Sequence, residues 1–251
     1  MSREVDLNAD LGEGFDDASL LPFLSSCNVA CGGHAGSAET MRSTLSAARR
    51  FGVACGAHPG FPDRKNFGRR EMPLTRAELS ATISDQIDRL VEAASGTGTA
   101  LSHIKPHGAL YHACNRRVDV ARCFLETTAR RQPAWIVVGQ AGSLFLEEAR
   151  RAGLRVAAEG FADRLYLDDG TLAPRGVAGA VFESAERAAE QALSLVAGEF
   201  VEAANGSRLT VKVQTICLHG DTPGASGFAK AIRARLEKAN IEIRPLGHAG
   251  K

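Results

Sequence analysis

The feature that most constrains the fold is a regular alternation of strand-like and helix-like segments. Apolar runs that predict strands lie near residues 4–9, 26–31, 53–57, 101–105, 135–139, 155–159 and 213–218. Amphipathic runs that predict helices lie between them, near residues 38–51, 75–94, 117–131, 142–152, 183–198 and 225–239. Strands that alternate with helices normally lie parallel in one sheet, so we expect one α/β domain over residues 1–251.

Two architectures fit this alternation: an open doubly wound sheet and a closed, seven-stranded, TIM-like (β/α) barrel. Because side chains alternate along a strand, Asp6, Asn8 and Asp10 share one face, and so do His103 and Lys105. In an open sheet covered on both sides that face is dry, and an unpaired charge there costs several kcal/mol. In a barrel the inward face opens into a solvated mouth. The pattern therefore favours the barrel.

The helix with the clearest signals begins near Thr75. Thr75 and Glu78 have the spacing of a capping box, and apolar residues follow at helical spacing on one face, at Leu79, Ile83, Ile87 and Leu90. Two long stretches, residues 59–74 and 160–180, lack such periodicity, and loops of this length are often lids or binding loops.

Composition excludes several classes of protein. The net charge of +1 provides no general field for nucleic acid or an anionic membrane, so we expect neither partner. No apolar run approaches the ~18 residues of a membrane span, and the N-terminus lacks the form of a signal peptide, which favours a cytoplasmic protein. The six cysteines are irregularly spaced. Cys27 and Cys31 lack a matching second pair for zinc, and we interpret all six as buried thiols.

Polar and ionisable residues follow several predicted strands, and the carboxyl ends of parallel strands meet at one edge of a sheet. Asp10 is a candidate general base or metal ligand, although a turn aspartate has the same local pattern. Lys105 could neutralise a phosphoryl oxygen or polarise a carbonyl; the alternative is a structural salt bridge to Asp10 or Glu159. His34 and His107 could titrate near neutral pH.

Other candidates lie near the same edge. Pro59 restricts His58 to an extended conformation, which fixes the direction of its side chain. Arg69 and Arg70 could hold a carboxylate or phosphate, although a solvated loop is the simpler interpretation. The remaining candidates are polar residues at or near strand ends: Asn8, Asn28, Tyr111, Glu159, Arg164 and His219.

Several common motifs are absent. The chain contains no Gly-x4-Gly-Lys-Ser/Thr, no His-Glu-x-x-His, no Gly-x-Ser-x-Gly and no Gly-x-Gly-x-x-Gly. A standard P-loop, nucleophilic serine chemistry and dinucleotide binding therefore have no local support.

Seven strings, in order along the chain, resemble the LamB/YcsF family. They are Asp6-Leu-Asn-Ala-Asp-Leu-Gly-Glu13, Asn28-Val-Ala-Cys-Gly-Gly-His-Ala-Gly36, His58-Pro-Gly, Phe67-Gly-Arg-Arg70, Lys105-Pro-His-Gly-Ala-Leu-Tyr111, Phe161-Ala-Asp-Arg164 and His219-Gly-Asp-Thr-Pro-Gly224. The chain departs from the family's usual residues at Ala9, Gly33, Ser37 and His112. Ala9 replaces a frequent cysteine, which argues against a nucleophilic thiol there.

The resemblance implies a seven-stranded, TIM-like (β/α) barrel of the glycoside hydrolase/deacetylase type. It implies the A subunit of an ATP-dependent 5-oxoprolinase, which cleaves the 5-oxoproline lactam to L-glutamate as ATP becomes ADP and phosphate. It also implies ATP with Mg²⁺ as cofactor and two further subunits, B and C, as partners.

On this basis we hypothesise roles for the candidates, none of them as a metal ligand. Asp10, His34, Lys105 and His107 are assigned to catalysis. Substrate binding is assigned to Asn8, Asn28, His58, Tyr111, Glu159 and His219. Phosphate binding is assigned to Arg69, Arg70 and Arg164.

Two other functions fit the same residues. One is a metal-dependent amidohydrolase or deacetylase, in which Asp10 with His34, His58 or His107 holds zinc and leaves a position for water. The other is a non-catalytic subunit that binds the substrate or positions its partners, which the missing P-loop favours.

Overall fold

Seven parallel strands close into a barrel in the computed structural model, which describes residues 3–221 and 224–247. The strand β1 pairs with β2 on one side and with β9 on the other, so the sheet has no open edge between them. The prediction of a closed seven-stranded barrel is therefore confirmed. Its strands are β1 (Arg3–Leu11), β2 (Ser26–Ala30), β3 (Ala54–His58), β4 (Leu101–Ile104), β5 (Ile136–Gln140), β6 (Val156–Phe161) and β9 (Thr215–Leu218).

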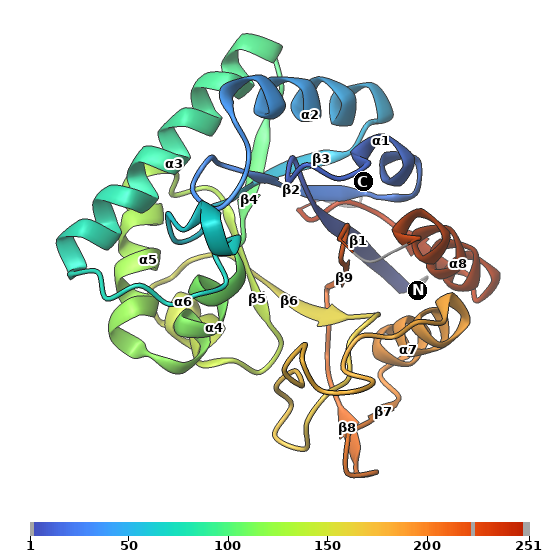
Figure 1. Ribbon diagram of the computed structural model, residues 1–251. Coiled ribbons are helices and arrows are strands. Elements are labelled where there is room, and N and C mark those ends of the chain that lie inside the picture. The colour runs from blue at the N-terminus through green and yellow to red at the C-terminus, as the bar shows by residue number, and fades with distance from the viewer. Residues whose placement is uncertain (1–2, 222–223, 248–251) are drawn as a thin grey trace.

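The helices lie around the outside of the strands (Figure 1). Six of them match the predicted segments: α2 (Ala38–Phe51), α3 (Arg76–Thr97), α5 (Val118–Arg131), α6 (Leu144–Arg151), α7 (Ala185–Ala197) and α8 (Ala225–Lys238). None of the helices in residues 3–221 and 224–247 is both long and apolar enough to cross a membrane.

The helix α3 forms for the reasons its sequence indicates. Thr75 accepts a hydrogen bond from the backbone N–H of Glu78, and the Glu78 side chain accepts one from the N–H of Thr75, which completes the capping box. Its apolar face is buried against the barrel, and Gly98 ends the helix in the left-handed conformation that glycine adopts most easily.

Several short elements are not predicted by periodicity. They are α1 (Asp17–Leu20), α4 (Gly108–Arg116), the 3₁₀ helices η1 (Leu21–Phe23) and η2 (Arg64–Asn66), and the strands β7 (Phe200–Glu202), β8 (Arg208–Thr210) and β10 (Ile241–Ile243). The hairpin of β7 and β8 lies at the edge of the molecule beside α7, and β10 extends the sheet next to β1 (Figure 1). Apart from α4, which has nine residues, these elements have only three or four residues and are too short to show a repeating pattern.

The inside of the barrel is polar along β1. Leu7, Ala9 and Leu11 belong to the apolar core, whereas Asp6, Asn8 and Asp10 alternate with them, as predicted. TIM-barrel interiors are mostly filled by branched apolar side chains, so this barrel is unusual in filling part of its interior with hydrogen-bonded groups.

The charges are more deeply buried than the sequence suggests. A solvated mouth was expected to hydrate Lys105, but its side chain is 4% exposed and that of Glu159 is 0% exposed. They are instead paired with each other, and pairing is what makes burial of charge tolerable.

Asp6 lies at the opposite end of the interior from Asp10. Its carboxylate accepts hydrogen bonds from the hydroxyls of Ser25 at 2.7 Å, Ser26 at 2.8 Å and Thr215 at 2.5 Å. Burial raises the pKa of Asp6 from 3.8 to about 6, and these hydroxyls offset only part of that rise.

We therefore predict that Asp6 weakens the fold as the pH rises from about 4 to 6. At these pH values the folded state keeps a proton that the unfolded chain releases, so the free energy of unfolding falls with increasing pH. Asp6→Asn removes this titration, and its stability relative to the wild type should rise by about 2 kcal/mol between pH 4.5 and 7.5. Urea denaturation of both proteins at both pH values measures this difference. If the difference in the free energy of unfolding between Asp6→Asn and the wild type is the same at pH 4.5 and pH 7.5, the prediction is contradicted.

Candidate active site

A cavity of about 450 Å³ lies at the carboxyl ends of the strands. Its lining includes residues from segments far apart in the sequence, as expected from the positions of the polar motifs. Among the predicted site residues, those that line it are Asp10, His58, Arg69, Lys105, His107, Tyr111, Arg164 and His219.

Lys105 lies between two carboxylates. Its Nζ atom is 3.1 Å from Asp10 Oδ1 and 2.8 Å from Glu159 Oε1. Burial by itself would lower the pKa of Lys105, but the charges of Asp10 and Glu159 raise it well above its ordinary value. The salt bridges expected as the structural alternative are thus present, and the same ammonium group also faces the cavity.

Asp10 is an ionised carboxylate. Burial would raise its pKa, but the charges of His58 and Lys105 hold the pKa well below its ordinary value. Its Oδ2 atom lies 3.2 Å from His58 Nε2, and its Oδ1 atom also accepts a hydrogen bond of 2.9 Å from Asn28 Nδ2. The group can therefore accept a proton or orient water without first losing one.

A layer of side chains beneath the cavity supports these two residues. Asn28 donates to Asn8 Oδ1 at 2.9 Å, and Asn8 donates to Glu159 Oε1 at 3.3 Å. Asn8, Asn28 and Glu159 are buried and do not line the cavity. Tyr111 both lines the cavity and donates from its hydroxyl to Glu159 Oε2 at 2.9 Å.

His103 extends this layer. Its Nε2 atom donates to Asn28 Oδ1 at 3.1 Å, because a carbonyl oxygen can only accept. Gly56 lies directly beside the imidazole, so closely that a Cβ atom would overlap it.

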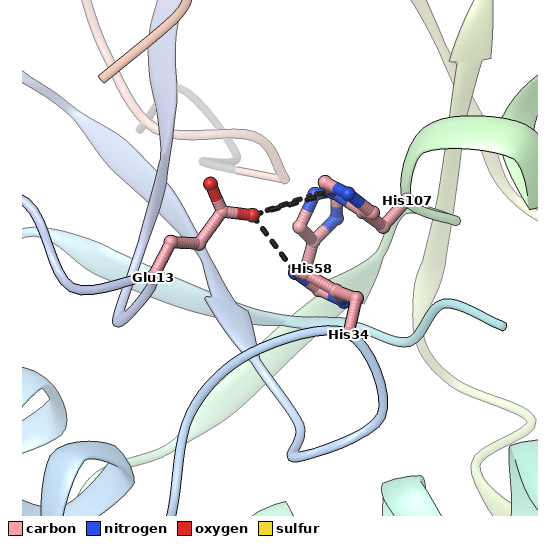
Figure 2. A group of neighbouring side chains, drawn as sticks. All are labelled: Glu13, His34, His58 and His107. Carbon is pink, nitrogen blue, oxygen red and sulfur yellow. Dashed lines mark hydrogen bonds and ion pairs between the residues drawn. The ribbon is translucent and has the colours of Figure 1, made fainter. Parts of the chain in front are cut away.

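Three imidazoles and a carboxylate gather on the β1–β4 side of the barrel. Glu13 Oε1 is 2.9 Å from His34 Nε2 and 3.3 Å from His107 Nδ1, and His58 Nε2 is 3.8 Å away (Figure 2). The His34 and His107 rings are stacked, with centroids 3.5 Å apart. His34 is buried behind the others and does not line the cavity.

The charge states in this cluster are strongly shifted. Burial would raise the pKa of Glu13, but hydrogen bonds with His107 and His34 lower it to about 2. Burial lowers the pKa of His34 to about 4, so this ring is neutral at pH 7. Burial would lower the pKa of His58, but the charge of Asp10 raises it.

Glu13 was not among the predicted site residues, although it belongs to the first motif. It follows Gly12 in the segment after β1, and both Gly12 and Gly14 have positive φ values. In such a turn the backbone leaves the strand conformation, so the alternation of side chains along β1 does not predict where Glu13 points. The signal available in the sequence was a second carboxylate three residues after Asp10.

The far side of the cavity carries arginines. Arg69 pairs with Asp221 at 2.5 Å, and Arg175 lies 3.4 Å from the same Asp221 Oδ2 atom. Arg164 is buried and donates to the carbonyl oxygens of Ala173 and Ala180, so it holds the loop that forms this wall. Arg70 is exposed and is not among the lining residues.

His219 lies against Asp163. Its Nδ1 atom is 3.0 Å from each Asp163 carboxylate oxygen, and its ring stacks on Phe161 with centroids 5.8 Å apart. A carboxylate at Nδ1 fixes the proton there, which leaves Nε2 as the atom that can accept from a ligand. Thr222 and Pro223, which belong to the last motif, lie outside the described residues.

The closed parallel barrel with a polar cavity at its strand ends defines this chain as a (β/α)-barrel protein. Residues 5–251 match the LamB/YcsF family, and the chain belongs to it. The A subunit of 5-oxoprolinase from Pyrococcus furiosus is 45% identical over 250 residues, which cover 97% of this chain and 98% of that protein.

One solved structure agrees with this assignment, and a second shares the fold. The lactam utilization protein from Thermus thermophilus superposes with a TM-score of 0.91 at 42% identity, covering 96% of this chain and 99% of that one. A family 4 carbohydrate esterase from Streptomyces lividans superposes with a TM-score of 0.52 at 14% identity, covering 96% and 91%. The second likeness bears on the fold alone.

We predict that Gly56→Ala destabilises the protein by about 2 kcal/mol, because the added methyl group displaces the His103 ring that supports Asn28. Gly96 in α3 is the matched control, since a Cβ atom there meets nothing within 4 Å. Gly96→Ala should stabilise the protein by about 0.5–1 kcal/mol. Chemical denaturation compares the two variants, and equal stability would contradict the described packing.

Proposed function

We propose that this chain is one component of a multi-subunit 5-oxoprolinase, which opens the 5-oxoproline lactam to L-glutamate with conversion of ATP to ADP and phosphate. The names of its full-length relatives support the substrate. The observation that carries the proposal is the cavity in which the ammonium group of Lys105 and the carboxylate of Asp10 lie side by side, 3.1 Å apart.

The chemistry of the lactam explains why both groups are useful. A five-membered lactam is a resonance-stabilised amide with a poorly electrophilic carbonyl carbon. Transfer of a phosphoryl group to its carbonyl oxygen makes the carbon electrophilic enough for water to attack. The C–N bond of the adduct then breaks as the nitrogen takes up a proton, which gives an acyl phosphate, and a second water hydrolyses this to L-glutamate and phosphate. Overall, 5-oxoproline, ATP and two water molecules give L-glutamate, ADP and inorganic phosphate.

We assign roles to the lining residues on this basis. Lys105 steadies negative charge on the lactam or phosphoryl oxygen, because a buried cation stabilises such charge strongly. Asp10 accepts the proton of the attacking water. Tyr111 and His219 orient the substrate, whereas Asn8, Asn28 and Glu159 act through Asp10 and Lys105.

The residues present also fit the phosphate groups of ATP. Arg69, Arg116 and Arg175 line the outer part of the cavity, where they could hold phosphoryl oxygens, and Mg²⁺ would accompany the nucleotide. We propose that two further subunits, B and C, complete the enzyme. Because the sequence has no P-loop, the remaining nucleotide contacts would come from those partners.

We predict that Lys105→Met and Asp10→Asn each lower the turnover of the assembled complex by about 10²–10³-fold, because each removes a charge at the reacting atoms. The measurement is ATP-dependent glutamate formation by the purified complex. Lys230→Met is the matched control, since Lys230 is exposed on α8, away from the cavity. Near-normal turnover in folded, assembled Lys105→Met would remove the proposed role.

Arg69 and Arg70 provide a second test, because adjacent arginines differ in their access to the cavity. We predict that Arg69→Ala raises KM for 5-oxoproline or ATP roughly tenfold or more, the effect of losing a charged hydrogen bond. Arg70→Ala should change KM much less. Steady-state kinetics of both variants decides, and a larger effect at Arg70 would contradict the assignment.

A further inference from the structure

Two imidazoles of the cluster have their proton positions fixed by the backbone. His58 Nδ1 lies 2.8 Å from the carbonyl oxygen of Lys105, and His107 Nε2 lies 2.9 Å from that of Phe67. A carbonyl oxygen can only accept, so each ring donates from that nitrogen. In the neutral rings, His58 Nε2 and His107 Nδ1 are therefore both lone pairs, and they face each other at 3.0 Å.

Two carboxylates face the same lone pairs. Asp10 Oδ2 is 3.2 Å from His58 Nε2, and Glu13 Oε1 is 3.3 Å from His107 Nδ1. Ionised carboxylates also only accept hydrogen bonds. Four acceptor atoms thus converge, and the third ring of the cluster, His34, can donate to one of them, Glu13 Oε1, at 2.9 Å.

A single proton does not resolve this arrangement. Protonation of His58 Nε2 would satisfy Asp10 or His107. It would leave Glu13 Oε1 and His107 Nδ1 as two acceptors 3.3 Å apart. A cation at the centre would be attractive to every one of these atoms, because each would direct a lone pair at it.

The spacing fits a metal ion. The ligand atoms of Glu13, His34, His58 and His107 all lie within 4.8 Å of one another. A tetrahedral ion with bonds of about 2.0–2.1 Å holds its ligands about 3.3 Å apart. The separations of 3.0, 3.3 and 3.8 Å among His58 Nε2, His107 Nδ1 and Glu13 Oε1 lie around this value. The His34 ring is stacked parallel to that of His107, so the lone pairs of these two rings cannot meet at the same ion.

We propose that Glu13, His58 and His107 bind a zinc-type divalent cation, while His34 donates to the Glu13 carboxylate from behind. Imidazole nitrogen suits zinc and its neighbours in the first transition series, whereas Mg²⁺ and Ca²⁺ prefer oxygen ligands, so this ion is distinct from any Mg²⁺ that accompanies ATP. The carbonyl oxygens of Lys105 and Phe67 are the outer partners that orient the rings of metal-binding histidines.

The site faces the cavity, because Glu13, His58 and His107 all line it. A bound ion of this kind polarises carbonyl oxygens and lowers the pKa of bound water. The main roles hypothesised from the sequence included no metal ligand, and the alternative zinc site combined Asp10, not Glu13, with the histidines. The inference goes beyond the proposed function and rests on the geometry of the cluster alone, so it is tested without turnover.

The first experiment uses the wild-type chain, stripped with a chelator and dialysed. We expect calorimetric titration with Zn²⁺ to show one saturable site per chain that millimolar Mg²⁺ does not occupy. Co²⁺ should give visible absorption bands of a site with nitrogen ligands. The absence of saturable Zn²⁺ binding would overturn the proposal, whatever the activity of the complex.

The second experiment locates the ion. We expect Glu13→Gln and His107→Asn to raise the Kd for Zn²⁺ at least about tenfold, with circular dichroism confirming the fold. His112→Asn is the matched control, because His112 is an exposed histidine outside the cluster, and its Kd should be unchanged. Unchanged Kd values in folded Glu13→Gln and His107→Asn, or loss of binding in His112→Asn, would place the ion elsewhere and overturn the proposal.

Discussion

The ion pairs of Lys105 inside the barrel are the interaction on which the site depends. One ammonium group, 4% exposed, lies between Asp10 and Glu159 at hydrogen-bond distances. Removing one partner of a buried pair leaves an uncompensated charge, which typically costs about 3–5 kcal/mol. Because the two carboxylates come from β1 and β6 and Lys105 directly follows β4, the same pairing that neutralises the charges also joins three strands around the barrel.

Buried polar groups are also paired with one another throughout the barrel interior, from the amino ends of the strands to their carboxyl ends. Asp6 is held by three hydroxyls, Asn8 links Thr215 to Glu159, and Asn28 links Asn8 to Asp10. Each layer satisfies the polar atoms of the next. Buried polar networks of this kind stabilise one arrangement of side chains, because partial satisfaction is costly. The hydrogen-bonded layers beneath the cavity therefore fix the positions of the residues that line it.

The two sides of the cavity differ in chemistry. The side formed after β1 to β4 is crowded with imidazole and carboxylate groups whose lone pairs converge, whereas the opposite side carries arginines and the Asp163–His219 pair. A lactam between them would meet a proton acceptor or metal-activated water on one side and cations for its negative charge on the other. This division supports the proposed function and the proposed ion together, although each is tested separately.

Local sequence determined the elements and their order. The period of the apolar residues located seven strands and six helices, and the capping box at Thr75 marked a helix start, because these signals depend only on neighbouring residues. The polar residues that end the strands were enough to predict convergence at one edge, as parallel strands require. The motifs also sufficed to predict the family.

Only the tertiary structure decided how these side chains meet. Asn8 and Glu159 are 151 residues apart, and Lys105 and Cys217 are 112 apart, so their contacts depend on closure of β1 against β9 and on strand register. The path of the turn after β1 brought Glu13 among three imidazoles, and the loop after β3 turned Arg69 inward and Arg70 outward. Such placements arise from packing between distant segments. The spacing of residues within one segment contains no information about that packing.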